Sequence, residues 1–290
     1  MRPIDLLAAV AVNLAWGLNF TIAKLGVGEL PPMLLIGLRY GLTAVLLFPW
    51  LRRWPRGQFL QILAVSFVLG FMHFSLMITG LQGVDSSIAA IAVQAQVPFA
   101  AILAFLFFRD AIGWRRAAGI ALALGGIVLI AGQPTGQSDP LSLAMVIGAS
   151  LVWAISSIQV KKLGSIDTLV LNAWIAALAT PQLLIGSLIF EGDRWASVPD
   201  AGFWGWAAVV YMAVAVTVFG YGLWYRLLLR YPVTTVMPLS LLAPTFGVLC
   251  GIFLLGESAS PEKLLGAAVT LAGVAIVILA PRPKPAEPAA

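Results

Sequence analysis

Polar side chains inside a long apolar stretch are the residues of this sequence best placed to do chemistry. The stretch 86–108 reads SSIAAIAVQAQVPFAAILAFLFF and places Gln94 and Pro98 one helical turn apart. The proline leaves a backbone carbonyl without its usual donor, and the glutamine amide can both donate and accept hydrogen bonds. A second stretch, 233–255, carries Pro244 146 positions after Pro98. Two proline-broken stretches in corresponding places indicate a binding site for a small molecule in the middle of a membrane.

The composition places these stretches in a membrane. The chain has 290 residues, of which 61% are hydrophobic and 10% are charged, whereas soluble domains are about 25% charged. We therefore predict an all-α membrane protein with ten transmembrane helices, each long enough to cross a bilayer. The first helix is too long for the core of a signal peptide and is expected to be retained. The predicted spans are 5–25, 33–51, 59–81, 86–108, 115–132, 142–160, 168–190, 203–225, 233–255 and 262–280.

The distribution of positive charge sets the predicted orientation. With the N-terminus in the cytoplasm and ten alternating spans, 13 of the 17 Lys and Arg residues lie on the cytoplasmic side. Only Arg194 and Lys263 lie on the opposite side, and Lys24 and Arg39 fall within spans. Cytoplasmic loops of membrane proteins carry such an excess, so both termini are predicted to be cytoplasmic. The excess also accounts for the pI near 9.7, and no nucleic-acid partner is expected.

The two halves of the chain repeat one another. Trp16 aligns with Trp153 and Asn19 with Ser156, both at an offset of 137. Glycines seven residues apart recur in each half and are expected to be notches at which helices pack; they are Gly119, Gly126, Gly266 and Gly273.

Each repeat holds five predicted spans, which fixes how the copies are related. Because five is odd, the second copy must enter the membrane from the opposite face, so the two five-helix repeats are predicted to be inverted. We expect the first repeat at 1–136, the second at 137–280 and a disordered, proline-rich tail at 281–290.

These repeats resemble the bacterial drug/metabolite transporter superfamily, in its ten-span form built from two EamA-type repeats. Three features carry the resemblance: the AWGLN motif at 15–19, the run 81–132, and the counterpart of that run in the second half, which includes Pro244, Glu257 and Gly266. It covers nearly the whole chain, and the sequence looks most like the exporters of amino acids among the members. The resemblance implies a central cavity between the repeats, with the third, fourth, eighth and ninth spans moving to open it. One departure is the pair Arg109–Asp110, where the family usually has Gly-Glu, and no effect on transport is expected from it.

The candidate cavity residues are polar, aromatic and proline residues within the spans, because polar groups in a membrane usually face a cavity or a partner. They are Asn13, Trp16, Asn19, Arg39, His73, Gln94, Pro98, Trp153, Ser156, Trp174, Tyr221, Ser240 and Pro244.

Structural roles stay open for several of these residues. Arg39 could meet a substrate carboxylate or could pair with backbone carbonyls, and His73 could be a neutral, hydrogen-bonded core residue. Trp16 and Trp153 could line a cavity or simply pack. Lys24 lies near the outer end of its span and is expected to extend toward the membrane surface.

Residues that are missing exclude several kinds of chemistry. No Asp or Glu lies in the middle of a predicted span, so no carboxylate proton relay or sodium site is expected. The lone His73 cannot make a metal site, and no cofactor is expected. A membrane enzyme would need a Ser/His pair, paired carboxylates or a His cluster, none of which the spans carry. Inverted repeats with broken helices argue against a permanent channel.

The expected function is export of small metabolites from the bacterial inner membrane by alternating access. Amides and hydroxyls would bind the polar ends of a small zwitterion such as an amino acid, and aromatic residues would bind its side chain. The alternative substrates are phosphorylated sugars, nucleotide conjugates or drugs. A phosphorylated anion would want several cations in the cavity, and only Lys24 and Arg39 lie within spans. The expected partners are a small-molecule substrate and the lipid bilayer, with a monomer as the working assumption.

Overall fold

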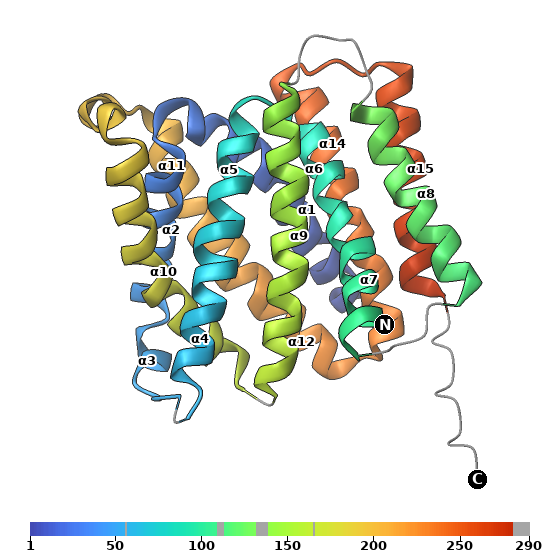
Figure 1. The fold of residues 1–290 in the computed structure, drawn as a ribbon, viewed down its shortest axis with the longest axis horizontal. Coiled ribbons are helices and arrows are strands. Elements are labelled where there is room, and N and C mark those ends of the chain that lie inside the picture. Colours follow the sequence, from blue (N-terminus) through green and yellow to red (C-terminus); the bar gives the residue numbers. More distant parts are fainter. Residues whose placement is uncertain (56, 109–112, 132–138, 165, 281–290) are drawn as a thin grey trace.

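The protein is a bundle of helices that run side by side, as Figure 1 shows for this computed structural model. The structure describes residues 1–55, 57–108, 113–131, 139–164 and 166–280, and it has no strand within these ranges. Eight helical runs within the same ranges are long and apolar enough to cross a membrane. They are Pro3–Glu29, Phe59–Gln82, Ser86–Phe107, Pro140–Leu163, Thr168–Phe190, Phe203–Arg230, Met237–Leu255 and Pro261–Leu279. The prediction of an all-helical, multi-pass membrane protein is therefore confirmed.

The elements follow the same order in each half of the chain. The first half contains α1 (Pro3–Glu29), α2 (Pro32–Leu46), α3 (Phe48–Leu51), α4 (Phe59–Val65), η1 (Ser66–His73), α5 (Phe74–Gln82), α6 (Ser86–Ala92), η2 (Val93–Ala95), α7 (Gln96–Phe108) and α8 (Trp114–Ala131). The second half contains α9 (Pro140–Leu163), α10 (Thr168–Phe190), η3 (Gly192–Asp200), α11 (Phe203–Tyr211), η4 (Met212–Tyr221), α12 (Gly222–Arg230), α13 (Val233–Val236), η5 (Met237–Leu241), α14 (Leu242–Leu255) and α15 (Pro261–Leu279).

Two of the ten predicted spans are not among the eight long apolar runs. The span 33–51 is divided at Leu47 into α2, of 15 residues, and the short α3. Pro49 is the second residue of α3, and its missing N–H cannot continue the hydrogen bonds of α2. The span 115–132 corresponds to α8, of 18 residues, whose first turn carries Arg115 and Arg116. The predicted tail 281–290 and the Arg109–Asp110 pair lie outside the described residues.

The two halves also carry matching irregularities in their helices. η1 and η4 are π-helical segments in the middle of the runs 59–82 and 203–230. η2 and η5 are 3₁₀ segments that come shortly before Pro98 and Pro244. A proline removes the hydrogen bond to the carbonyl four residues earlier, so the preceding turn can tighten. The irregular turns thus fall in the four helical runs that the family resemblance expects to move.

α8 and α15 pack with their backbones in close contact along one edge of the bundle (Figure 1). A Cβ atom added at Gly273 would lie 2.3 Å from the Ala123 nitrogen, and one at Gly126 would lie 2.5 Å from the Thr270 nitrogen. We call this contact, which also includes Gly119 and Gly266, the α8–α15 seam. The prediction that these glycines are helix-packing notches is confirmed.

The side chain of Lys24 binds the connection between α5 and α6, and its extension toward the membrane surface stays a prediction. Its Nζ donates to the carbonyl oxygens of Leu81, Gln82 and Val84 at 2.7, 2.9 and 2.8 Å. Carbonyls at the end of a helix have no partner within the helix. The ammonium of Lys24 therefore caps the C-terminal end of α5 and fixes its connection to α6.

Candidate functional site

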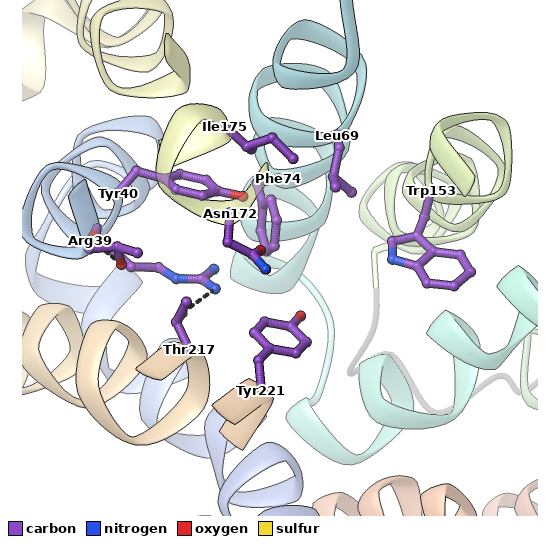
Figure 2. A pocket seen from close by; sticks show the side chains of 10 residues that line it. Arg39, Tyr40, Leu69, Phe74, Trp153, Asn172, Ile175, Thr217 and Tyr221 are labelled. Atoms are coloured by element: carbon purple, nitrogen blue, oxygen red, sulfur yellow. Dashed lines mark hydrogen bonds between the residues drawn. The ribbon is translucent and has the colours of Figure 1, made fainter. Parts of the chain in front are cut away.

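A small cavity of about 60 Å³ lies between elements of both halves, which is more than the roughly 10–15 Å³ that one water needs on a comparable measure. Its walls come from α2, η1 and α5 of the first half and from α9, α10 and η4 of the second half (Figure 2). The lining residues are Arg39, Tyr40, Thr43, Leu69, Phe74, Trp153, Asn172, Ile175, Thr217 and Tyr221. We call this space the Arg39 cavity.

Arg39 is the one charged residue that lines the cavity. It lies in the middle of α2 with only 4% of its surface exposed. One terminal nitrogen, Nη2, donates to Thr217 Oγ1 at 3.2 Å, and the guanidinium carbon lies 4.7 Å from the centre of the Phe74 ring. Its Nε is buried without a hydrogen-bond partner. Within the described residues Arg39 forms no ion pair, so its charge is not balanced by an acid there.

Thr217 reaches Arg39 because of the irregular helix that carries it. Its hydroxyl donates to the carbonyl of Met212, five residues earlier, at 2.9 Å. Five residues is the hydrogen-bond spacing of a π-helix, so the hydroxyl supplements the backbone bonds of η4. The oxygen of the same hydroxyl accepts from Arg39. This contact joins α2 of the first half to η4 of the second half across the cavity.

Aromatic rings form much of the remaining wall. Figure 2 shows the guanidinium of Arg39 extending toward the space beside Asn172 and Tyr221, with Trp153 on the far side. Trp16 packs behind Tyr221 with ring centroids 5.6 Å apart, and its indole N–H donates to the Val216 carbonyl at 3.2 Å. The cavity therefore offers one strong cation and a largely apolar, aromatic surface.

Three of the predicted cavity residues, Arg39, Trp153 and Tyr221, line the cavity. His73 lies beside it, against the Phe74 ring, and its Nδ1 lies 2.8 Å from the Ala149 carbonyl. A carbonyl can only accept, so Nδ1 carries the proton and His73 is held as a buried group between η1 and α9. Its arrangement is that of a hydrogen-bonded core residue.

The other predicted residues lie elsewhere in the bundle. Asn13 donates to the Ala9 carbonyl at 2.8 Å, and its Oδ1 is buried without a partner, as is that of Asn19. The indole N–H of Trp174 donates to the Arg53 carbonyl at 3.1 Å, at the end of the bundle where α3 lies. The remaining five sit in α9, in the run 86–108 and in η5–α14, and none is among the lining residues; they are Ser156, Gln94, Pro98, Ser240 and Pro244.

The sequence did not single out the other lining residues as a group. Tyr40 and Asn172 are polar residues within spans, so polarity alone marks them. Thr217 carries a weaker signal, because a threonine in a helix commonly bonds its own backbone. The apolar wall residues Leu69 and Ile175 are indistinguishable in the sequence from core residues.

Sequence comparisons find similarity to membrane transporters. The sequence matches the EamA-like transporter family over residues 3–132 and 140–279. It is 32% identical over 285 residues to a "Probable amino-acid metabolite efflux pump" of Salmonella typhimurium, covering 95% of each chain. A protein of Escherichia coli with the same description is 31% identical over 285 residues, again with 95% of each chain covered. "Uncharacterized transporter YoaV" of Bacillus subtilis is 25% identical, covering 93% of this chain and 94% of that protein.

A solved structure described as "Crystal structure of protein" shares the fold. It superposes with a TM-score of 0.65 and covers 95% of this chain and 96% of its own chain. The sequence identity is 15%, so the likeness concerns the fold alone.

Proposed function

This chain belongs to the EamA-like transporter family, and we propose that it exports amino acids or their derivatives across the bacterial inner membrane by alternating access. The family and the relatives are transporters and not enzymes. The expectation that this chain is not an enzyme is therefore confirmed.

The observation that carries the proposal is a buried arginine that has no acid beside it among the described residues and lies in a cavity between the two halves. A carboxylate is the natural partner of such a guanidinium, because the two groups can form parallel hydrogen bonds. The aromatic walls would hold an apolar side chain. The relatives described as amino-acid metabolite efflux pumps are consistent with a carboxylate substrate of this kind.

The contacts between helices support two inverted five-helix repeats, with ten spans in all. α2 packs against its counterpart α10, and α8 packs against its counterpart α15. α1 packs on η4 and α14, and its counterpart α9 packs on η1 and α7. A twofold axis between the halves would produce this exchange of partners. The odd number of spans in each repeat would put that axis in the membrane plane, and we propose the repeats at 1–136 and 137–280. The excess of Lys and Arg in the connections expected on one side supports our proposal that both termini lie in the cytoplasm.

The irregular turns of η1, η4, η2 and η5 would serve as hinges. A π-turn or a 3₁₀ turn leaves helical hydrogen bonds that are easily exchanged, and such turns are frequent at functional sites. Bending at these turns would close the cavity toward one face as it opens toward the other. No mid-membrane acid is needed for this cycle, so movement down a gradient is sufficient.

Counterflow into proteoliposomes tests this proposal. Purified protein would be reconstituted into vesicles preloaded with unlabelled substrate, and entry of radiolabelled amino acids and amino-acid derivatives would be measured. We expect at least one compound to accumulate transiently above the level in protein-free vesicles. If no member of a broad panel moves, the substrate class is wrong. If sustained single-channel currents appear, alternating access is wrong.

A further inference from the structure

We infer that the Arg39 cavity selects monocarboxylates that carry no ammonium group, such as N-acylated amino acids or 2-oxo acids, over free amino acids. This inference rests on the proposed transport function and narrows its substrate class. It also replaces the expectation of a zwitterionic substrate that the sequence alone supports.

The first step concerns the charge of Arg39. Its side chain is buried within the bundle, and its Nε has no hydrogen-bond partner. Thr217 supplies one neutral acceptor at 3.2 Å, which leaves the positive charge without a counter-charge among the described residues. A buried charge is stable only when it is paired. One substrate carboxylate would pair it and would use the donors that are still free.

The second step concerns the charge that a free amino acid would add. Its ammonium group would add a second positive charge to the cavity, and none of the ten lining residues is an acid that could neutralise that charge. Every Asp and Glu in the part of the chain that the structure describes lies in a loop or within the first or last turn of a helix. The carboxylate of a zwitterion would pair with Arg39, but the ammonium group of the zwitterion would then be the unpaired charge in the cavity. A monoanion leaves the cavity neutral.

The third step concerns the aromatic rings, which could hold an ammonium by cation–π contacts. Arg39 itself already lies over two of the rings, at 4.7 Å from the Phe74 centroid and 5.2 Å from the Tyr40 centroid. Only Trp153 and Tyr221 are left for a second cation. Cation–π contacts with these two rings are weaker than the cost of removing an ammonium ion from water, so the preference for a monoanion stands.

A series of compounds that share one side chain and differ in the charge of their polar groups tests the inference. On a leucine side chain the series consists of leucine, a zwitterion; N-acetylleucine and 4-methyl-2-oxopentanoate, both monoanions; and leucinamide, a cation. The same series on a phenylalanine side chain checks that the ranking does not depend on shape. Binding would be measured with detergent-purified protein at neutral pH, and counterflow with proteoliposomes. We expect the monoanions to bind and to move at least tenfold better than the zwitterion, and leucinamide to do neither. The two monoanions distinguish an acylated amino acid from an oxo acid as the source of the carboxylate.

Variants of Arg39 separate a role in recognition from a role in packing. Arg39→Met keeps the length of the side chain and removes its charge, so we expect the monoanion preference to fall at least tenfold. Arg39→Lys keeps the charge but loses the planar fork, so the preference should persist with weaker binding. As a control, Arg52→Met removes an exposed arginine that directly follows α3. We expect it to change neither the binding nor the transport of the four compounds. A purely structural Arg39 would lower folded yield without changing the ranking of the four compounds.

Each outcome decides something different. Equal or better binding and movement of leucine would overturn the inference and leave the transport proposal intact. An unchanged ranking in Arg39→Met would also overturn it. Binding of monoanions without any movement would overturn the transport proposal alone. Absence of both binding and movement for every compound would overturn both.

Discussion

The α8–α15 seam and the Arg39 cavity are contacts between the same two halves, built in opposite ways. In the seam, glycines bring backbones so close that a Cβ at Gly273 would lie 2.3 Å from a neighbouring nitrogen. In the cavity, η4 departs from the α-helix and Arg39 Nε lacks a partner. A contact made of backbone cannot slide without clashes, whereas irregular turns can exchange their bonds. The comparison assigns the seam to holding the halves together and the cavity to function.

The largest effect on stability should come from one methyl group in the seam. Gly126→Ala would place its Cβ 2.5 Å from the Thr270 nitrogen and 2.8 Å from the Gly266 oxygen, and neither backbone atom can move away easily. We expect a loss of about 1–3 kcal/mol, typical of overpacking, measured as a lower melting temperature in detergent. The matched control is Gly125→Ala on the same helix, where the new Cβ meets nothing within 4 Å. If both variants have the same melting temperature, close packing in the seam does not make Gly126 more sensitive to a methyl group than the exposed Gly125.

Arg39 should behave in the opposite way to the seam. Arg39→Met removes the cation of the cavity and, within the described part of the chain, breaks one side-chain hydrogen bond, the one to Thr217. We expect transport of a carboxylate substrate to fall at least about tenfold, equivalent to ~1.4 kcal/mol, while the melting temperature stays the same or rises. Counterflow and thermal unfolding of the same preparation check both parts. A collapse of stability with no change in transport per folded molecule would contradict this assignment.

A smaller effect on transport is expected at Thr217, which orients Arg39. Thr217→Val keeps the shape but removes the hydroxyl that accepts from Arg39 and donates to Met212. A neutral hydrogen bond contributes about 0.5–1.5 kcal/mol, so the KM for counterflow should rise roughly two- to tenfold with little change in the maximal rate. Thr217→Ser retains the hydroxyl and should restore the original KM. A loss confined to the maximal rate would place Thr217 in the hinge instead.

The smallest effect is expected at Asp139, which belongs to neither region. This residue is the N-cap that precedes α9, and its carboxylate accepts from the Ser142 hydroxyl at 2.8 Å and from the Ser142 backbone N–H at 2.9 Å. These bonds, the hydroxyl first, hold the pKa of the Asp139 carboxyl below its usual value. A depressed pKa stabilises the folded protein above the usual Asp value near 3.9, and this stabilisation is lost as the pH falls through the lower, folded value.

Thermal unfolding at several pH values checks the Asp139 prediction. Asp139→Ala should lower the melting temperature slightly near neutral pH, and the difference from the unaltered protein should shrink in acid. Asp139→Asn keeps a capping oxygen that does not titrate, so its difference from the unaltered protein should be smaller than that of Asp139→Ala near neutral pH and should also shrink in acid, because the unaltered protein loses its stabilisation there. A difference for Asp139→Ala that grows in acid would have the wrong sign.

The sequence predicts the helical bundle well because apolar length and spacing are strong signals. The glycines at 119, 126, 266 and 273 identify the seam in the sequence. Two glycines seven residues apart lie on one face of a helix, and without side chains they let a second helix pack closely against that face. The sequence did not predict the break at Leu47. Pro49 lies near the end of an apolar run, and the sequence does not show whether the helix before it ends there or continues. Polarity marks Arg39 but cannot say which residues from other helices face it.

The cavity residues were harder to predict for a physical reason. Gln94 lies in the 3₁₀ segment η2 and Pro98 near the start of α7, and such a break in an α-helix is a local property that the sequence shows. The lining of the cavity depends on which faces of α2, α9, α10 and η4 turn toward each other, and tertiary packing sets this. Thr217 is an example, because its position next to Arg39 follows from the π-turn that carries it.

The central claim is that one cavity between the two halves opens to each side of the membrane in turn, and cysteine accessibility tests it most directly. The native cysteine, Cys250, would be replaced with Cys250→Ala, and Thr43→Cys would place a thiol of similar size in the cavity wall. Labelling with a membrane-impermeant maleimide would be measured from each face of oriented vesicles. We predict labelling from both faces, with bound substrate slowing it at each. Labelling from a single face under all conditions, with or without substrate, would contradict the account.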